Sequence, residues 1–449
     1  MSISIWGRHA LVRRVLKLDT PVAERSEAEL MAETYRNYRW NFAMNLTDGA
    51  LFWFGTSFIS ATTILPLFLS KLTSSPFAIA LLAVLGQASW YLPQLFTAGM
   101  IERIPRKMPI VAHLGFFTER LPLWILPIAA LLSIRSPMLA LVLFLGAYAW
   151  HGLGAGIVAP AWTDMIARCF PVERRGWYFG FSNFVGTGLG AIGAIFSGWL
   201  LERYPFPTNF ALTFAVCAVA VALSWIFLSQ TREPVQRVPD EILNRTGPSW
   251  RKTVRIVRED GNFSRFLWAR LVANFGRMGL GFLTVAVIQR WAVTDNVIGI
   301  FTALMLVGQT LGNLLAGLVA DRYGHKVSLE MGQLISTMAF GIAWLAPNPD
   351  WYYVVFLLTG LAQGIVTVSG VLIAMEFSTP MHRPTYIGIA NTATGVGNTL
   401  APLLGGLLAI LAYGWVFAAS TLLGLIGLVM MWKLVREPRR QIEFLNLAD

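Results

Sequence analysis

The sequence has 449 residues, of which 55% are hydrophobic and only 13% are charged, and its formal net charge is +11 at pH 7. Its mean hydropathy is +0.59. A soluble protein of this length needs more polar surface to stay dissolved, so the composition excludes a soluble globular fold. The apolar stretches are continuous rather than alternating with polar residues, which excludes a membrane-spanning β-barrel.

The first 40 residues contain several basic side chains but no apolar segment as long as that of a cleavable signal peptide. We interpret them as a lead-in on the cytoplasmic membrane face, with an interfacial amphipathic helix as the alternative. Ser26 and Glu29 have the spacing of a capping box, which predicts a second short helix ahead of the first span.

Apolar runs of about 18 or more residues follow along the whole chain, each long enough to cross about 30 Å of hydrocarbon. They predict an all-α polytopic membrane protein with twelve transmembrane helices. The predicted spans are 42–69, 77–101, 109–133, 137–167, 177–200, 208–229, 265–290, 297–320, 327–346, 351–377, 385–411 and 415–435.

Basic residues fix the predicted orientation, because cytoplasmic loops carry the excess of Lys and Arg. Placing both termini inside leaves only four basic residues in the outer loops, which are Lys71, Arg135, Arg203 and Arg290. The remaining basic loop residues then face an anionic inner leaflet. The positive net charge therefore needs no nucleic-acid partner.

The chain repeats itself. "AGMIERIPRK" (98–107) after the second span resembles "AGLVADRYGHK" (316–326) after the eighth, and "GLGAGIV" (152–158) resembles "GLAQGIV" (360–366). The loops "PVERRGWYFGFSN" (171–183) and "PMHRPTYIGIAN" (380–391) also correspond. Such repeats predict two structurally similar halves.

These repeats divide the chain into five predicted parts. An N-terminal cytoplasmic segment (1–40) precedes a six-helix bundle (41–230), and a second six-helix bundle (265–436) precedes a cytoplasmic tail (437–449). Between the bundles lies a basic, polar linker (231–264), in which a short surface helix is expected near 250–258.

The segment "GLVADRYGHK" resembles the signature loop G-x-x-x-D-R-x-G-[RH]-[KR] of the major facilitator superfamily. The first-half version is degenerate, because Glu102 replaces the acid, Pro105 replaces the second glycine and one residue is missing. The resemblance covers residues 38–436 and implies two six-helix bundles around a central cavity, with parallel repeats.

By this resemblance, the two charged loops imply a cytoplasmic latch that breaks and reforms as the halves move. Its glycines are expected to permit a close approach and a tight turn, and the alternative is that the charges only hold the loops inside. We assign to the latch Glu102, Arg103, Asp164, Gly317, Asp321, Arg322, Gly324, Lys326 and Glu376. Asp164 and Glu376 are the expected partners of the first and second loop.

Ionisable residues inside spans are costly and mark functional sites by default. Asp48 follows Asn45 by about one turn in span 1, and Arg277 follows Asn274 in the corresponding part of span 7. We expect Asp48 and Arg277 to meet across the axis or to share a substrate. A fixed structural ion pair is the alternative.

Other polar residues within spans are weaker candidates for substrate or coupling contacts. His151 in span 4 has a near-neutral reference pKa that suits proton coupling, although a packed neutral imidazole is the alternative. The remaining candidates, for which interhelical packing is the alternative, are Gln87, Trp90, Tyr91, Gln309 and Gln363. Glu119 and Arg120 in span 3 are interpreted as a structural pair.

These features predict a secondary active transporter of a small molecule that works by alternating access, with H⁺ as a candidate coupling ion. The sequence contains no nucleotide-binding loop, no metal cluster and no nucleophile–base arrangement, so we expect neither an enzyme nor a bound cofactor. Cys169 and Cys217 are interpreted as packing residues. The alternatives are a receptor or scaffold that does not transport, and a lipid flippase.

We further expect a monomer in a cell membrane, with the bacterial inner membrane as the favoured location. The family's drug–proton antiporters carry a Gly-Pro pair in span 5. This chain has only glycines in span 5 and places Pro402 in span 11 instead, which argues against that subgroup.

Overall fold

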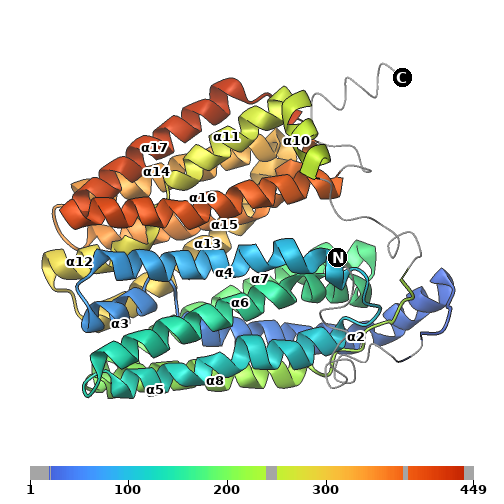
Figure 1. Cartoon of the computed structure of the whole chain (residues 1–449), viewed down its shortest axis with the longest axis horizontal. Helices are drawn as coiled ribbons and strands as arrows, with labels where there is room; N and C mark the ends of the chain where they lie inside the picture. The colour runs from blue at the N-terminus through green and yellow to red at the C-terminus, as the bar shows by residue number, and fades with distance from the viewer. Residues whose placement is uncertain (1–19, 21, 239–249, 378–382, 439–449) are drawn as a thin grey trace. The chain divides into compact units, whose positions relative to one another are not determined.

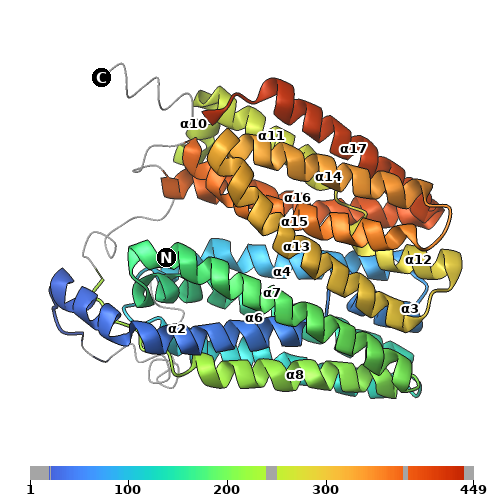
Figure 2. The same cartoon turned by 180° about the vertical axis from the view of Figure 1, so that it is seen from behind.

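A computed structural model describes residues 20, 22–238, 250–377 and 383–438, and every regular element within those ranges is a helix (Figures 1 and 2). Most of the predicted N-terminal lead-in and of the tail, together with part of the linker, lies outside these residues. The α-helices of the first half are α2 (Glu27–Ser57), α3 (Ile64–Leu72), α4 (Pro76–Ile101), α5 (Ile125–Leu132), α6 (Pro137–Cys169), α7 (Val172–Arg203) and α8 (Thr208–Leu228).

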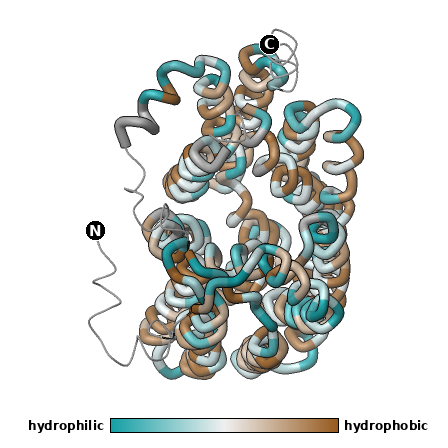
Figure 3. The backbone as a smooth tube through the Cα atoms, turned by 90° about the vertical axis from the view of Figure 1, so that its right-hand side faces the viewer, coloured by the Kyte–Doolittle hydropathy of each residue, from teal (hydrophilic) through white to brown (hydrophobic). Residues whose placement is uncertain are grey.

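The linker and the second half contain a further set of α-helices. They are α10 (Trp250–Glu259), α11 (Gly261–Phe275), α12 (Leu283–Trp291), α13 (Asp295–Tyr323), α14 (His325–Leu345), α15 (Trp351–Glu376), α16 (Arg383–Leu411) and α17 (Tyr413–Leu434). The expected linker helix is therefore confirmed as α10. Hydrophobic residues run along the helices throughout, as the brown segments of Figure 3 show.

The described helices fall into two compact units, which interleave along the chain. Unit 1 contains residues 1–58, 89–190 and 210–247, and unit 2 contains residues 59–88, 191–209 and 248–449. Unit 2 thus includes short pieces of the first half as well as the whole second half. In unit 1, α6 packs against α5 and α2, and in unit 2 α15 packs against α13 and α14 while α11 packs against α16 and α17.

Ten of the described helical segments are long and apolar enough to cross a membrane. The other two predicted spans are α14, which has 21 residues, and the first span, which the structure breaks. The prediction of one continuous helix over 42–69 is wrong: α2 ends at Ser57 and α3 begins at Ile64. Residues 58–63 include Ser60, Thr62 and Thr63, whose hydroxyls can form hydrogen bonds with backbone groups that lose their helical partners at the break.

The seventh span was also predicted as continuous, and it is also broken. Its α11 ends at Phe275, a turn and the short 3₁₀ helix η4 (Leu280–Phe282) follow, and α12 continues to Trp291. Here glycines explain the break. Gly276 lies so close to α17 that an added Cβ would sit 2.6 Å from Gly424 backbone atoms.

The capping box at the start of α2 is confirmed. The Ser26 hydroxyl accepts a hydrogen bond from the Glu29 N–H at 3.3 Å, and the Glu29 carboxylate accepts one from the Ser26 N–H at 2.8 Å. The predicted separate short helix is wrong, however. The helix that starts here runs without interruption into the first span because nothing between Glu27 and Ser57 breaks it.

The third span is irregular. It begins with two π-helical segments, η1 (Ile110–Leu114) and η2 (Phe116–Arg120), and continues through the 3₁₀ segment η3 (Leu121–Trp124) into α5. Pro122 at the start of η3 lacks an N–H group, so the regular hydrogen-bond ladder cannot continue there. π-Helical segments are frequent at functional sites.

An asparagine holds the chain in place directly after the last span of each half. In unit 1, Asn41 accepts from the Arg232 N–H at 2.9 Å and donates to the Arg232 carbonyl at 3.0 Å. In unit 2, Asn262 does the same to Arg436, at 2.8 and 3.1 Å. Both arginines begin the sequence Arg-Glu-Pro. The internal repeat thus extends to individual hydrogen bonds, and we call this contact the asparagine clamp.

Candidate transport site

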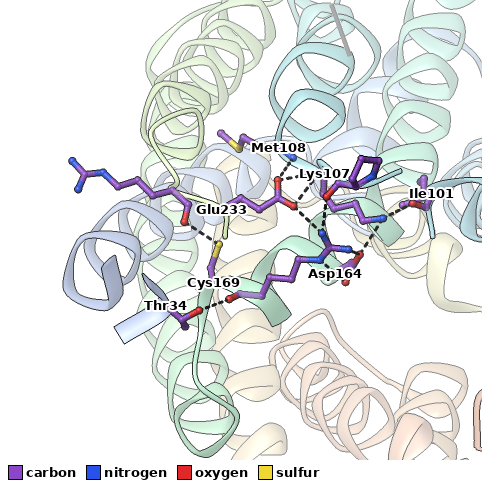
Figure 4. Close-up of polar contacts among 10 residues, drawn as sticks. Thr34, Ile101, Lys107, Met108, Asp164, Cys169 and Glu233 are labelled. Atoms are coloured by element: carbon purple, nitrogen blue, oxygen red, sulfur yellow. Dashed lines mark hydrogen bonds and ion pairs between the residues drawn. The ribbon is translucent and has the colours of Figure 1, made fainter. Parts of the chain in front are cut away.

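A buried ionic cluster lies at the predicted cytoplasmic end of unit 1 (Figure 4). Lys107 is fully buried, and its Nζ lies 3.2 Å from the Asp164 carboxylate and donates to the Ile101 carbonyl. Arg168 also binds Asp164, at 2.8 Å. The loop after span 2 is therefore held to the end of span 4 by Asp164, and the role of Asp164 in a latch stays a prediction.

Glu233 completes this cluster from the chain after span 6. Its carboxylate accepts the backbone N–H groups of Lys107 at 2.9 Å and Met108 at 2.8 Å, and it lies 3.4 Å from Arg168. Burial raises the pKa of the Glu233 carboxyl, against the two N–H groups and the nearby cations. Burial also lowers the pKa of the Lys107 amine, against the attraction of Asp164. Two cations and two anions thus compensate one another, with Lys107 and Glu233 buried and Asp164 still 38% exposed.

The loop residues chosen from the sequence do not make these contacts. The Glu102 side chain is exposed and the Arg103 side chain is half-buried, whereas Lys107 at the end of the same loop reaches Asp164. Lys107 corresponds to Lys326 in the repeat and was identifiable on that basis. Glu233 was not identifiable from the loop motif because it belongs to the linker.

The second loop has the predicted turn but only part of the predicted packing. Gly324 has a φ of 92°, and an added Cβ would lie 2.8 Å from the Glu437 carboxylate, so glycine is required there. The close approach expected at Gly317 is wrong: no atom of the described residues lies within 4 Å of the position a Cβ would take. Lys326 binds Glu330 one turn later at 2.6 Å.

Asp321 and Arg322 at the end of α13 are exposed, and the Arg322 guanidinium lies over the Tyr323 ring at 5.3 Å. The pairing of this loop with Glu376 stays a prediction. Glu437 stands in the second Arg-Glu-Pro sequence, as Glu233 stands in the first, and it reaches the corresponding loop. The two predicted latch loops therefore each lie beside a glutamate that follows the last span of its own half.

A second buried polar cluster lies within the predicted spans of unit 1. Asp48 on α2 is buried and accepts the Ser224 hydroxyl of α8 at 2.6 Å. Arg120 binds its neighbour Glu119 at 2.7 Å, and both side chains act electrostatically on Asp48. His151 Nδ1 lies 2.6 Å from the Glu119 carbonyl oxygen. Glu119 and Arg120 do form the expected pair, but within one network with Asp48 and His151.

Asn45 faces a different partner from Asp48. Its amide donates to the Asn41 carbonyl at 2.8 Å and to the Thr231 hydroxyl at 3.1 Å. These contacts join α2 to the chain that leaves α8, close to the asparagine clamp. They place Asn45 in the packing of unit 1, and its predicted substrate role stays a prediction.

The candidates of span 2 have separate environments. Gln87 accepts a hydrogen bond from the Asn398 amide at 3.3 Å within unit 2. In unit 1, Trp90 is exposed, Tyr91 is half-buried and the Gln94 amide donates back to the Trp90 carbonyl at 2.7 Å. Their role as a wall for substrate stays a prediction.

Three donor side chains project from span 7 in unit 2. Arg277 donates to the Gln363 amide oxygen on α15, and Arg270 donates to the Thr394 hydroxyl on α16 at 2.8 Å. Between them, Asn274 is buried against α16, where an added Cβ on Gly397 would lie 3.0 Å from the Asn274 amide nitrogen. We call these three residues the α11 donor stripe.

Asp48 and Arg277 lie in different units, and each has a polar partner inside its own unit. Their predicted meeting stays a prediction.

Gln309 on α13 is half-buried. Its backbone lies close to α15, because an added Cβ on Gly364 would be 2.3 Å from the Gln309 carbonyl oxygen. The glycines of "GLAQGIV" therefore let α13 and α15 approach closely.

Unit 2 also brings first-half segments against second-half helices at the predicted outer end. The Thr63 and Thr302 hydroxyls lie 2.6 Å apart, and Lys71 binds Asp295 at 3.0 Å. An added Cβ on Gly299 of α13 would lie 2.5 Å from the Cα of Gly198 on α7. We call these contacts the outer-end contacts.

This arrangement of repeated, apolar helices, two of them broken, defines a polytopic membrane protein built from two similar halves. The sequence profile of the Major Facilitator Superfamily matches residues 49–290 and 266–448. The chain therefore belongs to the Major Facilitator Superfamily, which confirms the resemblance of its loops.

Curated relatives match over parts of their length. A hexuronate transporter of Bacillus subtilis (strain 168) is 24% identical over 175 residues, covering 38% of this chain and 41% of the relative. A gallate transporter of Pseudomonas putida is 32% identical over 167 residues, covering 36% of each chain. The matched regions thus span about two fifths of these relatives.

Solved structures share the fold over most of the chain. The crystal structure of a D-xylose–proton symporter has a TM-score of 0.66 at 16% identity, covering 90% of this chain and 99% of that one. A bacterial homologue of the human lysosomal transporter Spinster, in an inward-facing and occupied conformation, has a TM-score of 0.64 at 14% identity, covering 88% and 96%. At such identities the likeness establishes the fold alone.

Proposed function

We propose that the protein is a secondary active transporter that carries a small molecule across a membrane by alternating access. The outer-end contacts are the observation that carries this proposal. They join segments of the first half to helices of the second half through a hydroxyl pair, one ion pair and glycine packing. Such contacts can separate and reform, because each contributes little free energy by itself.

The ionic cluster of Lys107, Asp164, Arg168 and Glu233 has the complementary place at the predicted cytoplasmic end. Its members come from the loop after span 2, the end of span 4 and the chain after span 6. They hold these three elements of unit 1 together at this end. The predicted latch would then act through the exposed Asp321 and Arg322 of the second loop.

The experiment for alternating access is a reversible cross-link. In a background with Cys169 and Cys217 replaced by Ala, Thr63→Cys and Thr302→Cys place two thiols where hydroxyls now lie 2.6 Å apart. Oxidation should abolish uptake into proteoliposomes and reduction should restore it. Each single-cysteine variant is the matched control. Full transport by the oxidised double variant would contradict the proposal.

Proton coupling through the Asp48 cluster forms part of the same proposal. Asp48 and Glu119 are two buried carboxylates with one guanidinium, that of Arg120, acting on both. If all three groups are ionised, the cluster carries one net negative charge, and a single proton neutralises it. A buried group that gains and loses one proton in this way is suited to coupling.

Uptake driven by an imposed pH gradient tests the coupling. Radiolabelled glucuronate and gallate are suitable first probes because the relatives are named as hexuronate and gallate transporters. Asp48→Asn should abolish the response to the gradient while exchange across the membrane persists. Asp350→Asn, which alters an exposed loop carboxylate, is the matched control. A wild-type protein that only equilibrates its substrate would be a facilitator, and a protein that binds without transport would be a receptor.

A further inference from the structure

Exposed basic side chains lie around the asparagine clamp of unit 2, where α10, α11 and the end of α17 come together (Figure 1). Asn262 at the start of α11 binds the backbone of Arg436, which follows α17. Arg265 on α11 and Lys433 on α17 are exposed, and each lies about one helical turn inside this clamp. The exposed Arg258 lies near the end of α10. We call Arg258, Arg265, Lys433 and Arg436 the unit 2 basic patch.

Among the described residues, no carboxylate forms an ion pair with a member of this patch. The nearby acidic side chains have other partners. Glu259 binds Arg255 at 2.7 Å, and Asp260 caps the first turn of α11. The Glu437 carboxylate lies against the backbone of Gly324. The four basic groups of the patch outnumber Asp260 and Glu437, so an excess of positive charge remains around the clamp.

Two exposed tryptophans accompany the basic groups. Trp268 is 62% exposed and lies three residues beyond Arg265, on the same side of α11. Trp432 is 64% exposed, and the Lys433 ammonium lies 5.8 Å from the centre of its ring. Tryptophan is enriched where a membrane meets water, and Lys and Arg side chains extend from an apolar helix surface to the headgroups. The order from the clamp inward, basic and then aromatic, therefore matches a headgroup layer and its boundary with hydrocarbon.

The equivalent place in unit 1 lacks these basic residues. Counted from the two clamp asparagines, Arg265 corresponds to Met44. Counted from the two Arg-Glu-Pro sequences, Lys433 corresponds to Ser229. The clamp forms in both units, so it does not itself require positive charge one turn further in. Loop residues are enough to set the orientation of a membrane protein, so basic residues within α11 and α17 need a separate explanation.

We propose that the unit 2 basic patch binds the headgroup of an anionic phospholipid in the leaflet at the predicted cytoplasmic end. Arg265 and Lys433 contact the phosphate, and Arg258 and Arg436 add positive charge outside it. Trp268 lies at the level where the headgroup meets the acyl chains. Guanidinium groups bind phosphate in a two-point geometry, and basic residues beside membrane helices hold anionic lipids. The proposal concerns a bound lipid and does not depend on the proposed transport function.

Native mass spectrometry of the full-length protein in detergent tests the proposal, because it counts the bound lipids. The probes are phosphatidylglycerol and phosphatidylcholine with the same acyl chains, and glycerol 3-phosphate as a soluble headgroup. We expect one phosphatidylglycerol to stay bound at a concentration at which phosphatidylcholine does not. Glycerol 3-phosphate should not bind at that concentration, since it lacks the acyl chains.

The variants locate the site. Arg265→Gln and Lys433→Gln should each lower the apparent affinity for phosphatidylglycerol by about 5-fold, and the double variant by about 30-fold, as expected for losing one and two basic contacts with an anionic lipid. Both side chains are exposed, so the variants should fold. Arg265→Lys keeps the charge and should retain most of the affinity. Arg39→Gln removes an exposed arginine outside the clamp of unit 1 and is the matched control, which should bind normally.

Three results would overturn the proposal. Equal retention of phosphatidylcholine would show that the bound lipid is not selected by charge. An equal loss of affinity in Arg39→Gln would show attraction to the positive charge of the whole protein rather than a site. Equal binding of glycerol 3-phosphate would show a site for a free anion instead of a membrane lipid.

Discussion

In unit 1 the ionisable groups inside the predicted spans lie near one another and interact electrostatically, whereas in unit 2 two arginines of span 7 donate hydrogen bonds to neutral side chains. Asp48, Glu119, Arg120 and His151 belong to one network across four helical segments. Arg277, which occupies the place of Asp48 in the repeat, binds the Gln363 amide instead. The two halves, which repeat one scaffold, thus differ: one holds two carboxylates beside a single guanidinium, and the other holds a row of donor side chains.

We expect the largest loss of stability from a substitution of Arg120 in unit 1. Arg120→Gln would leave the buried carboxylates of Glu119 and Asp48 without their cation, and breaking a buried pair costs about 3–5 kcal/mol. We expect Arg277→Gln to cost less, because the hydrogen bond that it removes joins Arg277 to a neutral amide, that of Gln363. Thermal or denaturant unfolding of the two purified variants measures both. Equal losses would show that the two units bury their charges in the same way.

The two units should respond alike where glycines allow helices to pack closely, because these glycines occupy equivalent positions in the repeat. Gly156 in unit 1 corresponds to Gly364 in unit 2, and an added Cβ would lie 2.5 Å from the Ser89 carbonyl oxygen and 2.3 Å from the Gln309 carbonyl oxygen, respectively. We expect Gly156→Ala and Gly364→Ala each to lower stability by about 1–3 kcal/mol, because helix backbones must move apart.

Gly146 on α6 is the control for these glycines, since no atom of the described residues lies within 4 Å of an added Cβ there. Gly146→Ala should be neutral or slightly stabilising because alanine is the better helix former. The unfolding temperatures of the three variants test whether the two packed glycines are less tolerant of alanine than Gly146. A tolerant Gly364→Ala protein would show that α13 and α15 pack less closely than described.

The asparagine clamps should give the smallest and most similar effects. Asn41→Ala and Asn262→Ala each remove two hydrogen bonds to the chain after the last span of a half. We expect a loss of about 1–2 kcal/mol for each variant, measured by unfolding in detergent. Asn41 is fully buried and Asn262 is 9% exposed, so the first variant should be the less stable of the two. A neutral Asn41→Ala variant would contradict this assignment.

The comparison also shows why some site residues were predictable. Asp48 and Arg277 were identifiable because a charge inside an apolar run is costly wherever the helix lies. The loop glycine at 324 was identifiable because its motif requires a positive φ, which the structure has. Gly317 was misjudged because the motif alone does not say which neighbour, if any, approaches it.

Other contacts depend on residues far apart in the chain. Glu233 reaches the backbone of Lys107 and Met108 from more than one hundred positions away, and Ser224 reaches Asp48 from an even greater separation. Hydropathy and helical spacing report only neighbours along one segment. They also gave spans 1 and 7 as continuous, because an apolar window does not register a short break that leaves its composition unchanged.

The sequence by itself determined that this is a duplicated, all-helical membrane protein with charged loops after spans 2 and 8, because transfer into hydrocarbon and the internal repeat act on local composition. Only the tertiary structure decided which charges lie beside one another and where the helices break. Those outcomes follow from the packing of distant segments, where burial makes each polar group depend on whichever partner the fold brings within hydrogen-bonding distance.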